Sequence, residues 1–130
     1  MSSLTENEQV YEWKIKKAAL ILRGTKPGQQ LYKLIELHDM TWIVKFFPRG
    51  QLFPDGSSRT TCAIFLTSID LTSRFKCQIE MGNHLQGDKN SEHVTFVQGV
   101  SQGFDEFMEC SELPTCIQND EFTIKITMVQ

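Results

Sequence analysis

Apolar and polar residues alternate with a period of two along much of this chain. In residues 42–47, Trp42, Val44 and Phe46 fall on one face of an extended chain, and the residues between them fall on the other. A strand with one buried face requires this alternation. Strand-like runs of this kind occur in seven places, at residues 11–15, 31–37, 42–47, 60–69, 74–81, 93–98 and 121–129.

The runs predict an all-β fold, an antiparallel β-sandwich of seven to eight strands, because no strand–helix–strand rhythm accompanies them. One short helix is predicted near residues 104–110, where Phe104, Phe107 and Met108 recur at helical spacing. It follows a glycine-punctuated corner at residues 99–103. Residues 18–22 either extend the first strand or begin another, and the sequence leaves both open.

Length and composition indicate a single domain. A chain of 130 residues is long enough to bury a core without metals or disulfides. Its composition, 40% hydrophobic and 22% charged, is ordinary for a globular protein. Residues 1–7 are predicted to form a disordered N-terminal tail, so that the domain covers residues 8–130. Turn-forming residues predict exposed loops at 54–58 and 82–92, and His38-Asp39 and Asn119-Asp120 predict turns.

Charge and cysteine usage bear on partners and compartment. The net charge is −3, so no basic field favours nucleic acid. No stretch of about 18 apolar residues is present, and the first residues lack the basic and apolar segments of a signal peptide. The four cysteines contain no C-x-x-C pair and are expected to be reduced thiols. We therefore expect a cytoplasmic or nuclear protein that binds neither nucleic acid nor membrane.

Residue types that carry catalysis are scattered along the chain. His38, His84 and His93 are far apart, and no metalloprotease, serine-hydrolase or phosphate-loop motif is present. Cys110 and Cys116 flank a proline-bearing loop with no histidine close in sequence, which favours structural thiols over a nucleophile or zinc ligand. We predict no catalytic residue, metal or cofactor. A cysteine- or metal-dependent enzyme is kept as the weakest alternative.

Three short patterns occur in a fixed order. They are W-x-x-x-x-x-P-x-G at residues 42–50, G-F-x-x-F at residues 103–107, and Asn119-Asp120 just before the last alternating run. Together with the alternating runs between them, they resemble the MATH domain (meprin and TRAF homology) over residues 8–130. The likeness is closest to the substrate-binding domains of speckle-type BTB/POZ adaptors, where an F-V-Q-G run similar to residues 96–99 precedes the corner.

The resemblance implies an eight-stranded sandwich whose exposed groove accepts a short extended peptide of a partner protein. In speckle-type adaptors that peptide is Ser/Thr-rich, and the partner is delivered to a cullin-based ubiquitin ligase. We therefore expect a non-catalytic, monomeric substrate-recognition module. The alternatives are a TRAF-type receptor or signalling adaptor domain, and a purely oligomerising domain that buries an apolar patch containing Phe65 and Phe104 against another copy.

Carried over by position, the resemblance implies a peptide-binding site with two parts. The groove wall uses Phe65, Phe75 and Val94, and the corner uses Ser101, Gln102, Gly103 and Phe104. The alternation around Phe75 fits a core residue equally well. Two departures reduce the aromatic surface: Gln102 stands where many MATH grooves carry tryptophan, and Val94 stands where speckle-type adaptors carry tyrosine. Val100 and Asp105 occupy positions that are basic in those adaptors, so the Ser/Thr-rich motif need not be this chain's ligand.

Overall fold

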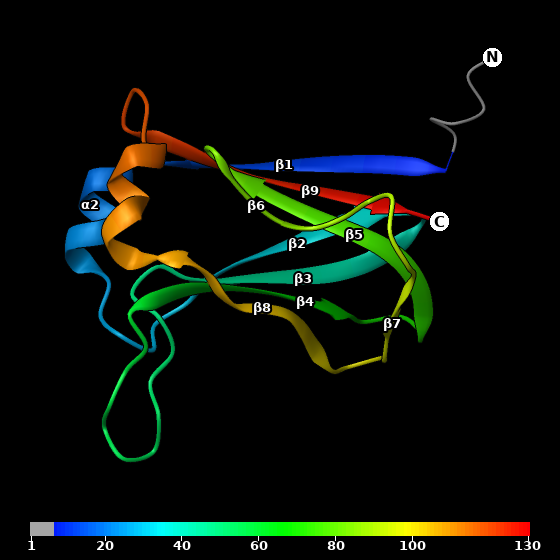
Figure 1. Ribbon diagram of the computed structural model, residues 1–130, viewed down its shortest axis with the longest axis horizontal. Helices are drawn as coiled ribbons and strands as arrows, with labels where there is room; N and C mark the ends of the chain where they lie inside the picture. Colours follow the sequence, from blue (N-terminus) through cyan, green and yellow to red (C-terminus); the bar gives the residue numbers. More distant parts are fainter. Residues whose placement is uncertain (1–6) are drawn as a thin grey trace.

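The computed structural model describes residues 7–130, which form two layers of strands with helical turns at one end (Figure 1). Of the predicted tail, residues 1–6 lie outside the described residues, while the Asn7 carbonyl accepts a hydrogen bond from the Gln130 N–H at 2.8 Å. The two helical segments are an α-helix at Ala18–Gly24 (α2) and a 3-10 helix at Cys110–Cys116 (η1). In chain order the elements are β1 (Glu8–Lys16), α2 (Ala18–Gly24), β2 (Leu31–Leu37), β3 (Met40–Phe47), β4 (Thr61–Ser68), β5 (Ser73–Met81), β6 (His84–Gly87), β7 (Val94–Phe96), β8 (Ser101–Glu109), η1 (Cys110–Cys116) and β9 (Glu121–Val129).

The strands form two antiparallel sheets that pack face to face. One has the order β1-β9-β5-β6, with β7 paired to the first residues of β5; the other has the order β2-β3-β4-β8. The predicted antiparallel sandwich is confirmed. Nine strands are described where seven to eight were predicted. Strand β6 lies within residues 82–92, which were predicted to be a surface loop.

The core lies between the sheets and is built from the apolar members of the alternating runs. Trp42 and Phe46 of β3 are fully buried, as their alternation predicts. Trp42 meets Phe75 and Phe96 of the facing sheet edge to face, with ring centroids 5.7 and 5.3 Å apart. The Trp42 indole N–H donates to the Leu37 carbonyl at 3.1 Å, so its burial leaves no donor without a partner.

Two tight turns predicted from the sequence are confirmed. His38 and Asp39 join β2 to β3, and Asn119 and Asp120 precede β9. All four residues have φ between 53° and 57°. Positive φ at both central residues defines a type I′ turn, whose twist matches that of the strands it joins and therefore fixes their register. Asn and Asp tolerate this region better than most residues do.

The short helix predicted near residues 104–110 is wrong. Most of these residues belong to strand β8, and η1 follows it. Ile64 pairs with Phe104 and Cys62 pairs with Met108, so β4 advances two residues (62 to 64) while β8 advances four (104 to 108). This β-bulge lets three apolar residues of β8 face the core at spacings that imitate a helix.

Residues 18–22 continue no strand and begin none, because they form helix α2. Lys17, with φ 58°, ends the extended conformation of β1. The N–H groups of Ala18 and Ala19 then donate to the carbonyl oxygen and the Oδ1 of Asp120, at 3.0 and 2.8 Å. Asp120 therefore caps the helix from the turn before β9. Neither described helix is long and apolar enough to cross a membrane.

Candidate functional site

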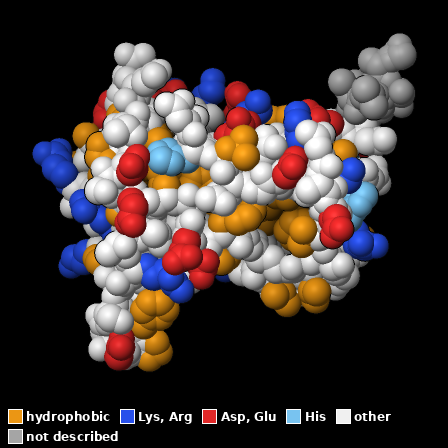
Figure 2. All heavy atoms as spheres, in the orientation of Figure 1, with side chains coloured by type: hydrophobic (Ala, Val, Ile, Leu, Met, Phe, Trp, Pro, Cys, Tyr) orange, Lys and Arg blue, Asp and Glu red, His pale blue; other side chains and the backbone are white. Residues whose placement is uncertain are grey.

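An apolar pocket opens between the sheets, where β8 lies opposite β6 and β7. Figure 2 shows apolar side chains gathered in a hollow near the middle of this face. The pocket volume is about 260 Å³, below the roughly 300–1,000 Å³ of small-molecule sites, so its size fits a side chain better than a whole metabolite. The lining residues come from five strands and one loop: Leu66, Cys77, Ile79, Gly87, Asp88, Ser91, Glu92, Val94, Phe96, Gln102, Gly103 and Phe104.

Phe104 supplies the aromatic wall of the pocket, and Gly87 makes room for it. The Phe104 ring is half-buried and packs against the core. Gly87 ends β6 with φ +78°; a Cβ there would overlap the Cys77 carbonyl oxygen and lie 3.1 Å from the Phe104 ring. Only glycine meets both demands, namely a left-handed backbone and close approach to a neighbouring ring. The absent side chain at Gly87 therefore helps to form the pocket.

The rim of the pocket is acidic on one side. Asp88 and Glu92 are exposed and line the opening. The nearby cation Lys89 is engaged elsewhere, because its Nζ lies 3.4 Å from Glu8 Oε1. The Asn90 N–H donates to Asp88 Oδ1 at 2.8 Å, which holds the loop in a turn. A ligand in the pocket would therefore have its flanking residues close to negative charge.

Gln102 bridges β8 to β7 across the mouth of the pocket. Its Oε1 accepts a hydrogen bond from the Val97 N–H at 2.7 Å, and its Nε2 donates to the Thr95 carbonyl at 2.6 Å. Strand β7 pairs with β5 and not with β8, so these side-chain bonds connect the two sheets at this corner. The backbone turns between them, with the Val100 N–H donating to the Val97 carbonyl at 3.0 Å.

Four of the seven residues predicted for the site meet at this pocket. They are Val94, Gln102, Gly103 and Phe104. Gly103 allows the backbone of β4 to approach closely, since a Cβ there would overlap the Ile64 carbonyl oxygen.

The other three predicted residues lie elsewhere. Phe75 is 3% exposed and packs against Trp42, so it is a core residue and not part of a groove wall. Phe65 is paired with Gly103 on the outer face of its sheet, and its ring centroid is 5.9 Å from that of Phe47. Ser101 is on the same outer face, 2.9 Å from Thr67 Oγ1. Strand alternation therefore separates Phe65 from Phe104, and one apolar patch cannot contain both.

Sequence reasoning missed the part of the site contributed by β6 and the loop after it. Gly87, Asp88 and Glu92 lie in a polar stretch that was interpreted as a surface excursion. The position of Gly87 three residues after His84 carries no pattern of its own. The signal for its role is spatial, because it depends on the Phe104 ring lying against it.

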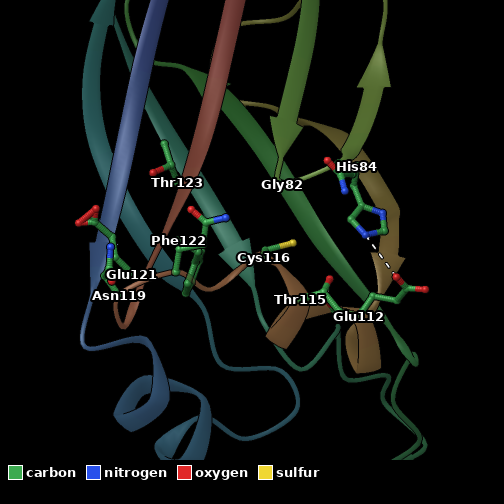
Figure 3. Close-up of a pocket in the computed structure, with 11 residues that line it drawn as sticks. Gly82, His84, Glu112, Thr115, Cys116, Asn119, Glu121, Phe122 and Thr123 are labelled. Carbon is green, nitrogen blue, oxygen red and sulfur yellow. Dashed lines mark hydrogen bonds and ion pairs between the residues drawn. The ribbon is translucent and has the colours of Figure 1, made fainter.

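A second, polar cleft lies at the other end of β6 (Figure 3). Its volume is about 680 Å³. His84 Nε2 lies 3.4 Å from Glu112 Oε2, and the Cys116 sulfur is 3.7 Å from the Met81 carbonyl oxygen. The lining comes from the β5–β6 turn and the first residue of β6, from η1, and from β9 with the turn before it: Gly82, Asn83, His84, Glu112, Thr115, Cys116, Gln118, Asn119, Glu121, Phe122 and Thr123.

The thiols are held in their protonated form by burial. Burial raises the pKa of Cys77 to about 12 and also raises the pKa of Cys116. Cys110 does not line the cleft with Cys116, and its sulfur lies 3.8 Å from that of Cys62. Among residues 7–130, no group of three or more His, Cys, Asp or Glu side chains is arranged to hold a metal ion. A protonated thiol is a poor nucleophile.

No family model matches the chain, and no curated protein matches it significantly.

Proposed function

We propose that this chain is a protein-interaction module that binds a short, extended peptide and receives one of its apolar side chains in the pocket beside Phe104. The observation that carries the proposal is the pocket itself, which is apolar, open to solvent and placed between the edges of two sheets. Burying one apolar side chain is worth about 1.5–3 kcal/mol. That gain is sufficient to select peptides by a single anchor residue.

The resemblance to MATH domains supports the same proposal. An antiparallel sandwich is the fold that the resemblance implies, and three of its corner residues, Gln102, Gly103 and Phe104, line the pocket. On this basis the module recognises substrates for a cullin-based ubiquitin ligase, as the speckle-type adaptors do. A TRAF-type receptor adaptor is the alternative use of the same pocket. In both roles the domain acts without catalysis, as a monomer, in the cytoplasm or nucleus.

The charges around the pocket argue for a basic residue beside the apolar anchor. Asp88 and Glu92 line the opening and are exposed. A peptide whose main chain runs past this rim would bring its side chains within a Debye length of these two carboxylates. A motif with an apolar anchor and a flanking Arg or Lys is therefore preferred over one with flanking acidic residues.

A peptide array tests this proposal. The domain is applied to nine-residue peptides in which the central residue is Leu, Phe, Ala or Ser and the flanking residues are Arg, Ser or Glu. We expect binding to follow the order Leu or Phe over Ala over Ser at the centre, and Arg over Glu at the flanks. Binding that ignores the central residue would contradict the pocket as the recognition site.

Self-association is a second candidate because one outer sheet face is partly apolar. Tyr32 and Leu34 of strand β2 are 67% and 58% exposed. Phe65 is half-buried on the same sheet face. Sedimentation across a range of concentrations, with Leu34→Glu as the disrupting variant, distinguishes this role from peptide binding. A concentration-dependent dimer that Leu34→Glu abolishes would favour self-association.

A further inference from the structure

Strand β7 has one edge paired and one edge that faces β8. Its three residues pair with Ser73 to Phe75 of β5. Successive residues of a strand direct their main-chain groups to opposite edges. The Thr95 carbonyl and the Val97 N–H, which belong to residues two apart, therefore face the same way, away from β5 and toward Gln102. An incoming strand in either direction would use these two groups, because they flank one residue position on the free edge.

Both groups are occupied by a single side chain. The Gln102 carboxamide accepts from Val97 and donates to Thr95, at 2.7 and 2.6 Å. An amide that accepts from one residue and donates to the residue two positions earlier imitates the main chain of a paired strand. Gln102 is half-buried and sits at the pocket mouth, so its side chain can rotate into solvent without disturbing the core.

We infer that Gln102 is a displaceable plug on the free edge of β7, and that the peptide's main chain takes its place when the ligand binds. This inference rests on the proposed function, because the same peptide must anchor in the pocket. Exchanging two side-chain hydrogen bonds for two main-chain hydrogen bonds yields little net free energy, since each is worth about the same. The plug therefore restricts binding to peptides whose side-chain anchor is strong.

Removing the carboxamide should release this restriction. Gln102→Met keeps the length and shape of the side chain and removes both hydrogen bonds. The probe is the array peptide with a central Leu and flanking Arg residues. We expect Gln102→Met to bind it about tenfold more tightly than the natural chain. The matched control is Gln98→Met, because the Gln98 amide donates to the Ile69 carbonyl at 3.0 Å, away from the β7 edge.

A second form of the probe tests whether the peptide's main chain occupies the edge. The same peptide is made with N-methyl groups at alternate positions on either side of the Leu, which removes main-chain donors and leaves the anchor. The gain from Gln102→Met should disappear with at least one of the methylated peptides. Hydrogen–deuterium exchange gives a readout without ligand, since the Val97 amide should exchange faster in Gln102→Met than in Gln98→Met.

The outcomes separate the plug from the proposed function. Binding that requires Phe104 but is unchanged by Gln102→Met would overturn the plug and leave peptide binding in place. Equal Val97 exchange in the two glutamine variants would also overturn the plug. No binding of the Leu probe by the natural chain or by Gln102→Met would overturn both ideas.

Discussion

The apolar pocket and the polar cleft lie at opposite ends of β6, and they differ in whether their lining side chains already have partners. The polar cleft beside His84 is the larger, at about 680 Å³, but its His84 and Glu112 side chains already pair with each other. The apolar pocket beside Gly87 holds about 260 Å³, and its wall is formed by half-buried Phe104. Apolar surface left in water is the part that gains when a partner covers it. The apolar pocket, although smaller, is therefore the better binding site.

The sharpest contrast between the two regions is in their thiols. Cys77 lines the pocket and Cys116 lines the cleft. Because burial raises the pKa of Cys77 to about 12, its reactive thiolate fraction at pH 8 should be roughly a thousandfold below that of an ordinary cysteine. We expect iodoacetamide to label Cys116 well before Cys77, as measured by peptide mass spectrometry over time. Equal labelling rates would show that the pocket wall opens readily.

A backbone change at Gly87 should have the next largest effect. Gly87→Ala places a Cβ against the Cys77 carbonyl and the Phe104 ring at positive φ. The free energy of unfolding should fall by about 2–4 kcal/mol, as measured by urea denaturation. Gly56→Ala is the matched control, since Gly56 also has positive φ but a Cβ there meets nothing within 4 Å. Equal losses in both variants would mean that the contact with Phe104 adds nothing.

Neutralising one charge of the acidic rim should have a smaller effect than the change at Gly87, and the effect should be on binding. Asp88→Asn and Glu92→Gln each remove one charge at the pocket opening. Each variant should weaken binding of the Leu–Arg probe about threefold at low salt, because exposed charge pairs are worth about 0.2–1 kcal/mol. Isothermal titration calorimetry at two salt concentrations provides the measurement. The effect should shrink at high salt, and a salt-independent change would argue against a charge interaction.

A substitution in the polar cleft should have the smallest effect on stability and on peptide binding. Glu112→Gln removes the ion pair with His84. The His84 side chain is 27% exposed and the Glu112 side chain is 51% exposed. Because exposed ion pairs contribute little, the free energy of unfolding should change by less than about 0.5 kcal/mol. Probe affinity should not change at all. A loss of peptide binding in Glu112→Gln would move the site from the pocket to the cleft.

The sequence predicted those parts of the fold that depend on neighbouring residues. Period-two alternation located most strands, and His38-Asp39 and Asn119-Asp120 marked turns, because both signals are local. Helix α2 was missed because its cap, Asp120, lies 101 positions from Ala19. The bulge at residues 104–108 was mistaken for a helix because it depends on the pairing of β8 with β4.

The site was predicted in part for the same reason. Gln102, Gly103 and Phe104 are consecutive, so a resemblance carried by the corner placed them together. Phe65 was assigned to the same groove, but strand register turns it to the opposite face of its sheet. The contribution of Gly87 required knowledge of which ring lies against it. Contacts between distant segments decide both points, and a single sequence does not display them.

The most direct test compares two aromatic residues on opposite faces of one sheet. Phe104→Ala removes the pocket wall, whereas Phe65→Ala removes an aromatic ring of the outer face that packs on Phe47. Titration calorimetry with the Leu–Arg probe should show binding at least tenfold weaker for Phe104→Ala, and unchanged binding for Phe65→Ala, with both variants folded by circular dichroism. Normal binding by Phe104→Ala, or an equal loss in both variants, would contradict recognition through the apolar pocket.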